Sequence, residues 1–405
     1  MSDGGAAGAP RVLSAPRVVA GERVLRPGAV VLDGGRVAAV LPERPAPDPS
    51  HLCLDHGVLV PGLVDLQVNG FAGVDLADAD AAGWARVAGA LAATGVTSFL
   101  PTFITAPLDR LAASLGAARA AMERSGGARV LGAHAEGPFL SPARPGAHDP
   151  AAMLDPSPAA VERLLQAGEG VLAVATLAPE RPGGLAAVAR LAEAGVVVSI
   201  GHSDATGAVV AAAADAGARM VTHLFNAQRG LHQREPGVAG QGLVDRRLTL
   251  GLIADFHHVH PTVCRLVLAA APGRVALVTD AVAAAGMPPG RYLLGGVAVH
   301  VSQEGPPRRD DGTIAGSTLR LDRAVANLAG LGHGLAEAVA AASRVPADLL
   351  GRGDLGRIAP GARADLAWLD DDLRALATWV GGTLAWPAPA ELASLASHHG
   401  AGARP

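Results

Sequence analysis

The sequence predicts an α/β protein: a (β/α)8 barrel of the TIM type with a small β-sandwich domain beside it. Three observations favour this fold class: eight short apolar runs typical of strands, alanine-rich helical stretches between them, and polar residues just after the runs. The runs are Leu63–Val68, Val96–Leu100, Arg129–Ala133, Val171–Thr176, Val196–Ile200, Arg219–Thr222, Leu248–Ala254 and Arg274–Thr279. Continuous apolar strands that alternate with helices indicate a parallel sheet buried on both faces, and eight units fit a closed barrel. A doubly wound open sheet is the alternative, but it gives no reason for eight units.

Helices are expected in the segments between the runs, among them Ala79–Ala93, Leu108–Arg124, Ala159–Ala167 and Leu185–Ala194. After the eighth run, Tyr292–Val301 is strand-like, and two more helices are expected at Leu319–Ala329 and Gly334–Ala342. In a barrel, the polar residues that follow the strands lie on one face, at the carboxyl ends of the strands, where barrel enzymes keep their active sites.

The two ends of the chain are predicted to pair into the small β-domain. Near the start, Ala29–Leu32 and Arg36–Val40 flank a turn at Asp33–Gly35, and a similar strand recurs late, at Ala364–Leu369. The expected division is therefore a first part of the small domain at 1–58, the barrel at 59–345, a second part at 346–386, and a flexible tail at 387–405.

Composition narrows the class of protein. The 405 residues are 50% hydrophobic with a net charge of −4, and no basic block favours a nucleic-acid or membrane surface as the partner. Cys53 and Cys264 are far apart, so no disulfide framework is expected. No apolar leader and no run of about 18 apolar residues is present, so we expect a cytoplasmic protein. All 33 basic residues are arginine.

Metal-binding residue types follow three of the apolar runs. Glu136 follows the third run, His202 the fifth and His223 the sixth. One carboxylate and two neutral imidazoles leave a position open on a Zn²⁺-like ion, where a bound water becomes a nucleophile at neutral pH. Asp280 ends the eighth run and is predicted to move protons as a general acid and base. The alternatives are that Asp280 caps the next turn or is a further metal ligand, and that the histidines merely satisfy local polar groups.

Several short stretches resemble one known family, from about Ala29 to Val380. The resemblance is to the N-acetylglucosamine-6-phosphate deacetylases of the amidohydrolase superfamily. It is carried by Pro61–Gly70, His134–Phe139, Gly201–Ala205, His223–Ala227, Arg234–Gly237, Ile253–Asp255, His258–Val259, Val278–Ala281, Ile314–Ser317, Leu355–Ile358 and Pro360–Gly361. It implies that Glu136, His202 and His223 hold the metal and that Asp280 is the catalytic acid and base.

The resemblance also implies a set of substrate-binding residues. His148, with Ala147 before it, would meet the acetamide, and His148 would polarise its carbonyl. The sugar phosphate would meet Asn226, the Ala227 backbone, Arg234 and His258, with the loop Ile314, Ala315 and Gly316 on the substrate side. In the family this arginine reaches across from a neighbouring subunit, which implies a homodimer. His257 and His260 stand close enough to His258 to share its role.

Two departures bear on the metal count. Many amidohydrolases bind a second metal through His-x-His after the first strand, but here Gln67 and Asn69 take those places as vestigial positions. Other relatives bridge two metals with a carboxylated lysine, and this chain has no lysine. We therefore expect one divalent ion per subunit, zinc before iron or another metal. Where the family often has methionine, this chain has Gln228, which bears on the identity of the sugar.

The predicted activity is hydrolysis of N-acetylglucosamine 6-phosphate to glucosamine 6-phosphate and acetate, in amino-sugar catabolism or cell-wall sugar recycling. The alternatives are a deacetylase of another N-acetyl-hexosamine 6-phosphate, such as the galactosamine compound, an enzyme for N-acyl amino acids, or a catalytically silent sugar-phosphate-binding homologue. A phosphate-site arginine disfavours the N-acyl amino acids, and the intact metal residues with Asp280 disfavour the silent protein.

Overall fold

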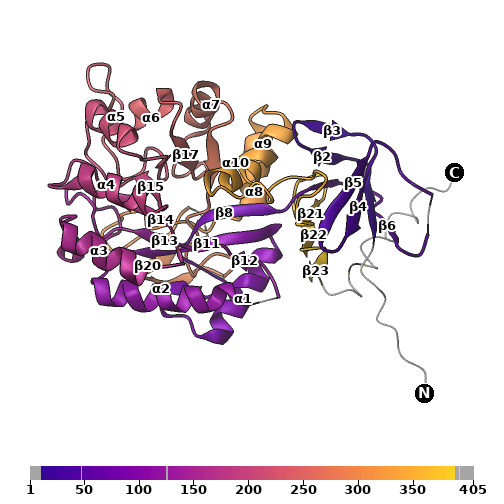
Figure 1. Cartoon of the computed structure of the whole chain (residues 1–405), viewed down its shortest axis with the longest axis horizontal. Coiled ribbons are helices and arrows are strands. Elements are labelled where there is room, and N and C mark those ends of the chain that lie inside the picture. The colour runs from indigo at the N-terminus through magenta and orange to yellow at the C-terminus, as the bar shows by residue number, and fades with distance from the viewer. Residues whose placement is uncertain (1–10, 47, 125, 304, 388–391, 393–405) are drawn as a thin grey trace.

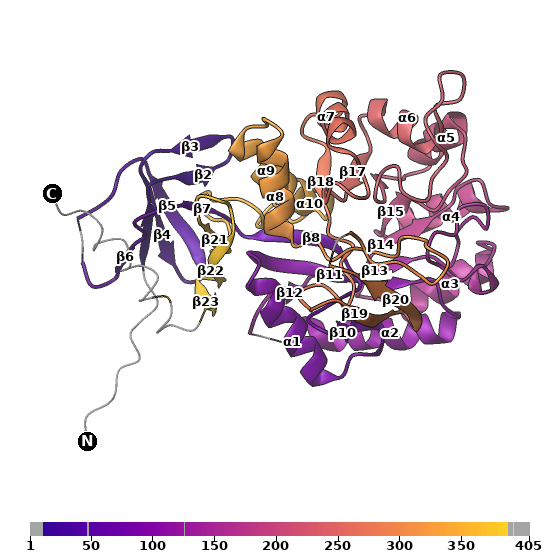
Figure 2. The same cartoon turned by 180° about the vertical axis from the view of Figure 1, so that it is seen from behind.

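The structure, a computed structural model, describes residues 11–387 and residue 392, except residues 47, 125 and 304. Of the predicted tail at 387–405, only Pro387 and Leu392 fall among the described residues. The barrel is the larger of two bodies, and a small β-domain lies at one end of it (Figure 1). Helices α8 (Leu321–Gly330), α9 (Leu335–Ala341) and α10 (Arg344–Leu349) lie between the two bodies, as the view from behind also shows (Figure 2).

The eight predicted runs all overlap strands of one parallel sheet. The strands are β8 (Leu63–Val68), β11 (Val96–Ile104), β13 (Ala133–Glu136), β14 (Leu172–Leu177), β15 (Val197–Ile200), β16 (Met220–Val221), β17 (Thr249–Leu252) and β18 (Val275–Leu277), with a short β12 (Arg129–Val130) beside β11. The third run, Arg129–Ala133, however, contains β12 and only the first residue of β13. A bridge between Val68 and Ala281 joins the two ends of the sheet. The predicted (β/α)8 barrel is confirmed.

The helices that follow the strands cover the outside of the barrel. They are α1 (Ala81–Ala92), α2 (Leu108–Met122), α3 (Pro158–Ala167), α4 (Gly184–Glu193), α5 (Gly207–Asp215), α6 (Gly237–Val244) and α7 (Pro261–Ala270). Local chemistry sets several starts. Ser157 accepts from the Ala160 amide ahead of Pro158, and Thr206 accepts from Val209. These side chains satisfy amides that the first helical turn leaves without partners.

The small domain is a sandwich of two sheets, and both ends of the chain contribute to it. One sheet holds β5 (Arg36–Leu41), β4 (Gly28–Asp33), β1 (Val12–Ala15) and β6 (His51–Cys53). The other holds β23 (Thr383–Trp386), β22 (Ala375–Val380), β21 (Leu366–Leu369), β7 (Val58–Pro61), β2 (Val18–Ala20) and β3 (Arg23–Leu25). The core between the sheets includes Leu13, Trp368 and Trp379, all buried.

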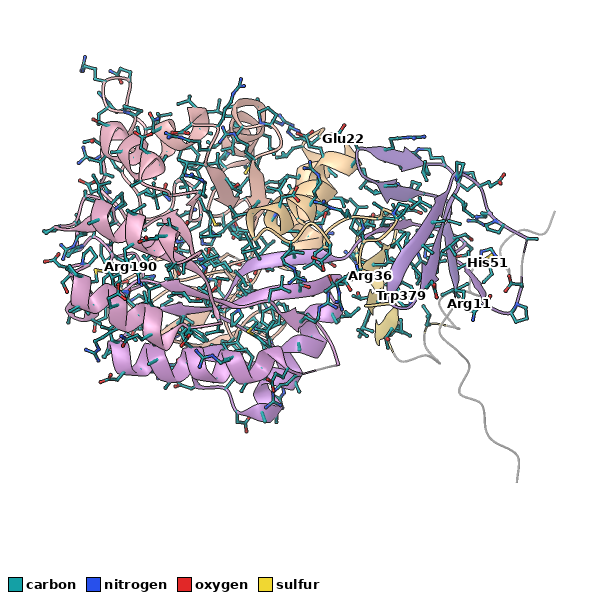
Figure 3. The ribbon with its side chains drawn as sticks, viewed as in Figure 1. Arg11, Glu22, Arg36, His51, Arg190 and Trp379 are labelled. Atoms are coloured by element: carbon teal, nitrogen blue, oxygen red, sulfur yellow. The ribbon has the colours of Figure 1, made fainter. Side chains whose placement is uncertain are left out.

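Direct contacts join the two ends of the chain in this domain. The Arg36 guanidinium donates to the Gly361 carbonyl at 2.7 Å, and Trp379 lies within the same domain (Figure 3). The structure places β7 in the small-domain sheet, so the predicted boundary at 58/59 runs through that strand. The boundary at 345/346 likewise runs through α10.

A hairpin inserted after β18 lies over the carboxyl end of the barrel strands. Its strands are β19 (Gly290–Leu294) and β20 (Val297–Val301), as the strand-like pattern at Tyr292–Val301 predicts. Leu294 of the hairpin packs in a cluster with Ile104 and Ala147, which come from the barrel and its loops. Two shorter strands, β9 (Gly70–Phe71) and β10 (Val74–Asp75), follow β8. Among the described helices, none has the length and apolar character needed to cross a membrane.

Candidate metal centre and active-site pocket

Three predicted site residues follow barrel strands in an unusual backbone conformation. His202, His223 and Asp280 have φ angles of +47°, +28° and +50°. This left-handed region costs a non-glycine residue roughly 1–2 kcal/mol, and such strain concentrates at functional sites. Glu180 supports the turn at His202, because its carboxylate accepts from the Ser203 hydroxyl at 2.7 Å and the Asp204 amide at 2.6 Å.

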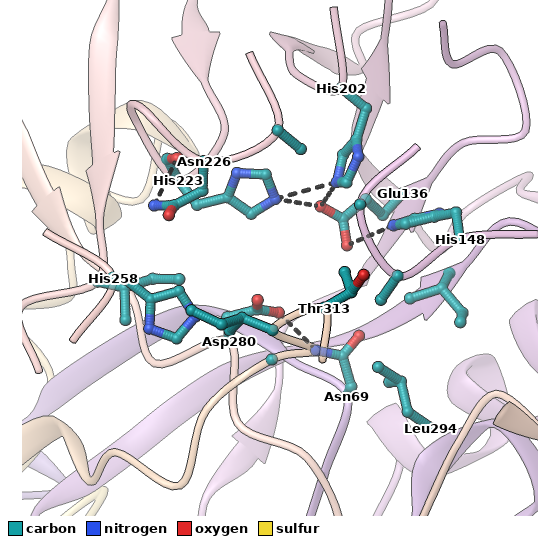
Figure 4. Close-up of a pocket in the computed structure, with 17 residues that line it drawn as sticks. Asn69, Glu136, His148, His202, His223, Asn226, His258, Asp280, Leu294 and Thr313 are labelled. Carbon is teal, nitrogen blue, oxygen red and sulfur yellow. Dashed lines mark hydrogen bonds and ion pairs between the residues drawn. The ribbon is translucent and has the colours of Figure 1, made fainter. Parts of the chain in front are cut away.

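Glu136, His202 and His223 converge on one point at the barrel mouth (Figure 4). Glu136 Oε1 lies 2.9 Å from His223 Nε2 and 3.4 Å from His202 Nε2, and the two imidazole nitrogens are 3.2 Å apart. Ligand atoms that are each about 2.0–2.2 Å from one tetrahedral ion are separated from one another by distances close to these three. The three side chains therefore fit a single divalent metal.

The hydrogen bond at Nδ1 of a histidine shows whether its Nε2 can bind a metal or instead carries a proton. His202 Nδ1 lies 3.1 Å from the Arg144 carbonyl, so this nitrogen carries the proton and Nε2 keeps a lone pair for a metal. His148 has the opposite arrangement, because its Nδ1 accepts from the Thr105 amide at 3.2 Å. Its Nε2 then carries the proton, 3.7 Å from Glu136 Oε2. His148 lies close enough to Glu136 and His202 to form an alternative ligand group with them, but the hydrogen bond at its Nδ1 makes it a donor.

The electrostatics of the cluster favour a bound cation. Burial alone would raise the pKa of Glu136, but hydrogen bonds from the histidines around it hold that pKa well below its usual value. Burial lowers the pKa of His202 to about 4, so this imidazole is neutral at pH 7. Burial also disfavours charge on His223, yet the Glu136 carboxylate beside it outweighs this and raises its pKa. A buried carboxylate thus attracts positive charge to the point where the ligand atoms meet.

Asp280 lies across the pocket from Glu136 (Figure 4). Burial, followed by repulsion from Glu136, raises the pKa of Asp280 to about 6. Its Oδ1 accepts from the Asn69 amide at 2.7 Å and from the Gln67 amide at 3.1 Å. A carboxylate whose pKa lies this close to neutrality can both accept and return a proton near pH 7. Gln67 and Asn69, which the sequence predicts to be vestigial metal positions, therefore contact Asp280 directly.

The pocket between these groups has a volume of about 280 Å³. Twelve of the predicted site residues line it: Asn69, Glu136, Ala147, His148, His202, His223, Asn226, Ala227, His258, Asp280, Ile314 and Gly316. Five further residues line it that the sequence analysis did not select: Ile104, Gly146, Ile253, Leu294 and Thr313. The aliphatic members of this second set look like ordinary core residues in the sequence, so only their place in the fold could identify them.

The structure distinguishes among the three neighbouring histidines. His258 lines the pocket, and its Nδ1 lies 2.6 Å from Asp255 Oδ2, which leaves Nε2 available to a ligand. His257 is exposed, and His260 is exposed and caps α7 through the Thr262 amide. His258 is therefore the member of this group that a substrate in the pocket can contact.

Three predicted site residues do not line this pocket. Arg234 is exposed on the loop before α6, where its own amide donates to His232. Ala315 is buried in the cluster under the hairpin. Gln67 lies behind the pocket wall and reaches it only through its bonds to Glu136 and Asp280. Within one chain, then, the arginine predicted for the phosphate is away from the other site residues.

Two buried polar residues near the site have structural roles. Gln228 is buried, and its amide donates to the Thr222 carbonyl at 2.6 Å while its oxygen accepts from the Phe225 amide at 3.2 Å. It therefore fixes the turn that carries His223 and does not line the pocket. His134 is buried with its Nε2 2.7 Å from the Thr176 hydroxyl, and burial lowers its pKa to about 4, which agrees with a structural role.

A closed parallel barrel with this cluster and an acidic residue across the pocket defines a metal-dependent amidohydrolase. The amidohydrolase family model matches residues 58–386. The chain belongs to this family, and within it to the deacetylases of N-acetyl-hexosamine 6-phosphates. It is 43% identical over 334 residues to an N-acetylgalactosamine-6-phosphate deacetylase of Escherichia coli O157:H7, covering 82% of this chain and 88% of the relative.

Two further relatives agree with this family. An N-acetylglucosamine-6-phosphate deacetylase of Vibrio furnissii is 37% identical over 333 residues, covering 82% of this chain and 83% of the relative. The solved structure of N-acetyl-D-glucosamine-6-phosphate deacetylase from Mycobacterium smegmatis, a mutant in complex with N-acetyl-D-glucosamine-6-phosphate, superposes with a TM-score of 0.89. It is 38% identical and covers 94% of this chain and 100% of that one.

Proposed function

We propose that this protein hydrolyses the acetamide of N-acetylglucosamine 6-phosphate, giving glucosamine 6-phosphate and acetate. The observation that carries the proposal is the cluster of Glu136, His202 and His223, which faces Asp280 across one pocket in a chain of this family. The Vibrio and Mycobacterium relatives carry the name of this activity, and a complex with the sugar phosphate exists for the latter.

The reaction divides among the pocket residues as follows. The metal, when held by Glu136, His202 and His223, supplies a water of lowered pKa and polarises the carbonyl. Asp280 takes a proton from the attacking water as the oxygen of that water bonds to the acetamide carbon. The Nε2 proton of His148 stabilises the negative charge that develops on the carbonyl oxygen. Asp280 then returns its proton to the sugar nitrogen as the carbon–nitrogen bond breaks, which releases the amine and acetate.

The sugar phosphate lies on the side of the pocket formed by His258, Asn226 and the Ala227 backbone. Both side chains line the pocket, and the Asp255 carboxylate at His258 Nδ1 leaves Nε2 of that ring facing the ligand. Arg234 is exposed on its own chain, which supports its delivery to the pocket of a second subunit in a homodimer. An arginine fork binds a phosphate through two hydrogen bonds.

We expect one zinc ion per subunit. Two imidazoles and one carboxylate suit zinc, and the same set accepts iron or another divalent ion. The amide side chains of Gln67 and Asn69 are poor ligands and already donate to carboxylates, which supports a single metal. A sugar phosphate is charged and does not cross a bilayer unaided, which supports action in the cytoplasm.

N-acetylgalactosamine 6-phosphate is a second candidate substrate. The observation that favours it is the 43% identity to a deacetylase of that compound. The two sugars differ only in the orientation of one hydroxyl group, and the acetamide and the phosphate are common to both. The residues that contact these two groups therefore do not decide between them.

An acetate-release assay tests both candidates. We would compare the 6-phosphates of N-acetylglucosamine, N-acetylgalactosamine and N-acetylmannosamine with their unphosphorylated forms. The proposal expects kcat/KM to be highest for the first compound and to fall strongly without the phosphate. A preference for the galactosamine compound would favour the second candidate. Tight binding of a sugar phosphate without acetate release would indicate a silent binding protein.

A further inference from the structure

The inner face of strand β8 carries three polar side chains in a row. Asp65 and Gln67 lie two residues apart in β8 and project to the same side, and Asn69 directly follows the strand and continues the row. Each is at least 98% buried. Asp65 and the side chains of Gln67 and Asn69 all contact the segment that contains Asp280. These three residues therefore have specific hydrogen-bond partners.

The backbones of the two segments are joined around this row. The backbone N–H of Asp280 donates to the backbone carbonyl of Gln67 at 2.9 Å. The backbone N–H of Asn69 donates to the backbone carbonyl of Ala281 at 2.8 Å. Asp65 extends the contact, because its Oδ2 accepts from the Thr279 hydroxyl at 2.6 Å. The Asp280 side chain is therefore held relative to β8 by hydrogen bonds on both sides of it.

The side-chain contacts to Asp280 all reach the same oxygen. Asn69 Nδ2 donates to Asp280 Oδ1 at 2.7 Å (Figure 4), and Gln67 Nε2 donates to that atom at 3.1 Å. An amide nitrogen donates but does not accept, so an oxygen that accepts two such bonds cannot also carry a proton toward them. Reversing either amide would place its carbonyl oxygen against the carboxylate, which is repulsive.

We propose that Asn69 is a positioning residue for the reaction, and that it acts with Gln67. The two amides hold Asp280 through Oδ1, so Oδ2 is the oxygen that takes the proton from water and returns it to the sugar nitrogen. Residues at the vestigial second-metal positions thus replace an ion by hydrogen-bond donors. This inference rests on the proposed deacetylase function, since it assigns one atom within that reaction.

The two amides are expected to differ in one respect. Gln67 Nε2 also donates to Glu136 Oε1 at 3.1 Å, so it contacts a metal ligand as well as Asp280. Asn69 has no such bond and lines the pocket beside Asp280. A change at Gln67 should therefore alter both metal affinity and turnover, whereas a change at Asn69 should alter turnover alone.

The test is a comparison of Asn69→Leu and Gln67→Met, which keep the size of each side chain and remove its donors. For Asn69→Leu we expect kcat to fall about 10- to 100-fold, since small misplacement of a reacting group has effects of this size. KM and metal content should stay within about 2-fold of wild type on the same reasoning. Gln67→Met should lower kcat and weaken metal binding together. Asn69→Ala replaces Asn69→Leu if the latter does not fold.

Thr378→Val is the matched control, because it removes a buried hydrogen bond to the Ala92 carbonyl far from the pocket. It should lower thermal stability and leave kcat unchanged. If the wild-type enzyme is active and the Asn69 variants have a normal kcat, the inference about Asn69 is overturned while the proposed function stands. Loss of metal in the Asn69 variants, or a change confined to KM, would also overturn it. A wild-type enzyme that releases no acetate would overturn the proposed function and this inference with it.

Discussion

Glu136 Oε1 lies 2.9 Å from His223 Nε2, although the two residues are 87 positions apart in the chain. They meet because each lies at the carboxyl end of its barrel strand, β13 or β16, with β14 and β15 between them. His202, after β15, completes the set. The metal centre is thus a consequence of strand order in a closed parallel sheet.

One equivalent of metal per chain is the first prediction. The three ligand atoms converge on a single point, and Gln67 and Asn69 offer donors where a second ion would need ligands. Elemental analysis of the purified protein should give about one equivalent, and removal by a chelator should abolish turnover until zinc is restored. Two tightly bound equivalents would contradict the single-metal interpretation.

Asp280→Asn should lose turnover and keep binding. The substitution preserves size but removes the group that accepts and returns the proton, so kcat should fall about 10²- to 10⁴-fold. Metal content and the affinity for the sugar phosphate should change little. Steady-state kinetics combined with calorimetric binding would separate these effects. Near-normal kcat would remove Asp280 from the acid and base role.

Arg234→Ala should raise KM for phosphorylated substrates by about 10-fold or more, because a charged hydrogen bond to phosphate contributes roughly 1.5–3 kcal/mol. Activity on an unphosphorylated sugar should change little. Arg23→Ala, on the exposed edge of the small domain, is the matched control and should leave both activities unchanged. Equal losses on both substrates would remove Arg234 from the phosphate site.

Mixing two impaired variants, assayed at a substrate concentration below KM, tests whether Arg234 acts across a dimer. In a mixed dimer of Arg234→Ala and Asp280→Asn chains, one pocket keeps its own Asp280 and receives Arg234 from the other chain. Remixing the subunits should therefore restore about a quarter of the wild-type activity, since half the dimers are mixed and each has one complete pocket. An arginine that acts only within its own chain would give no such recovery.

Asp65 should make the stability of the protein depend on pH. Burial raises its pKa to about 7 in the folded protein, against an ordinary value of 3.8. The folded state therefore holds a proton that the unfolded chain releases, and the free energy of unfolding should fall as pH rises from about 4 to 7. Asp65→Asn removes this dependence. The free energy of unfolding of the variant minus that of wild type should therefore be more positive at pH 8 than at pH 5.

Urea denaturation at both pH values, with a fixed metal concentration, measures this difference. The expected change is on the order of a few kcal/mol, since one unit of pKa shift corresponds to about 1.4 kcal/mol. Thr378→Val does not titrate, and its difference from wild type should be the same at both pH values. A pH-independent difference for Asp65→Asn would show that the carboxyl is ionised in the folded protein.

Much of the fold followed from local pattern. Each apolar run between Leu63 and Thr279 overlaps a strand of the barrel sheet, because a strand buried on both faces is mostly apolar. Element ends were less predictable. Strand β7 joins the small-domain sheet through β2 and β21, and the pairing of segments more than 300 positions apart leaves no local signal at Val58.

Parts of the pocket were beyond local reasoning. Ile104 and Leu294 read as core residues, and they face the pocket only because a hairpin packs onto the barrel mouth. Gln228 looked like a residue that selects the sugar, but its amide bonds to the backbone of its own loop. In each case the decisive fact is which neighbour the side chain meets, and that neighbour is set by packing.

The sequence by itself determined the strand and helix order, the residue types at the strand ends, and hence a metal-assisted hydrolase. Only the tertiary structure decided that His258 faces the pocket while Arg234 does not, and that Asn69 and Gln67 bond to one oxygen of Asp280. The reason is physical. Periodicity reports which face of an element is buried, whereas a hydrogen bond between residues 211 positions apart depends on the closure of the whole barrel.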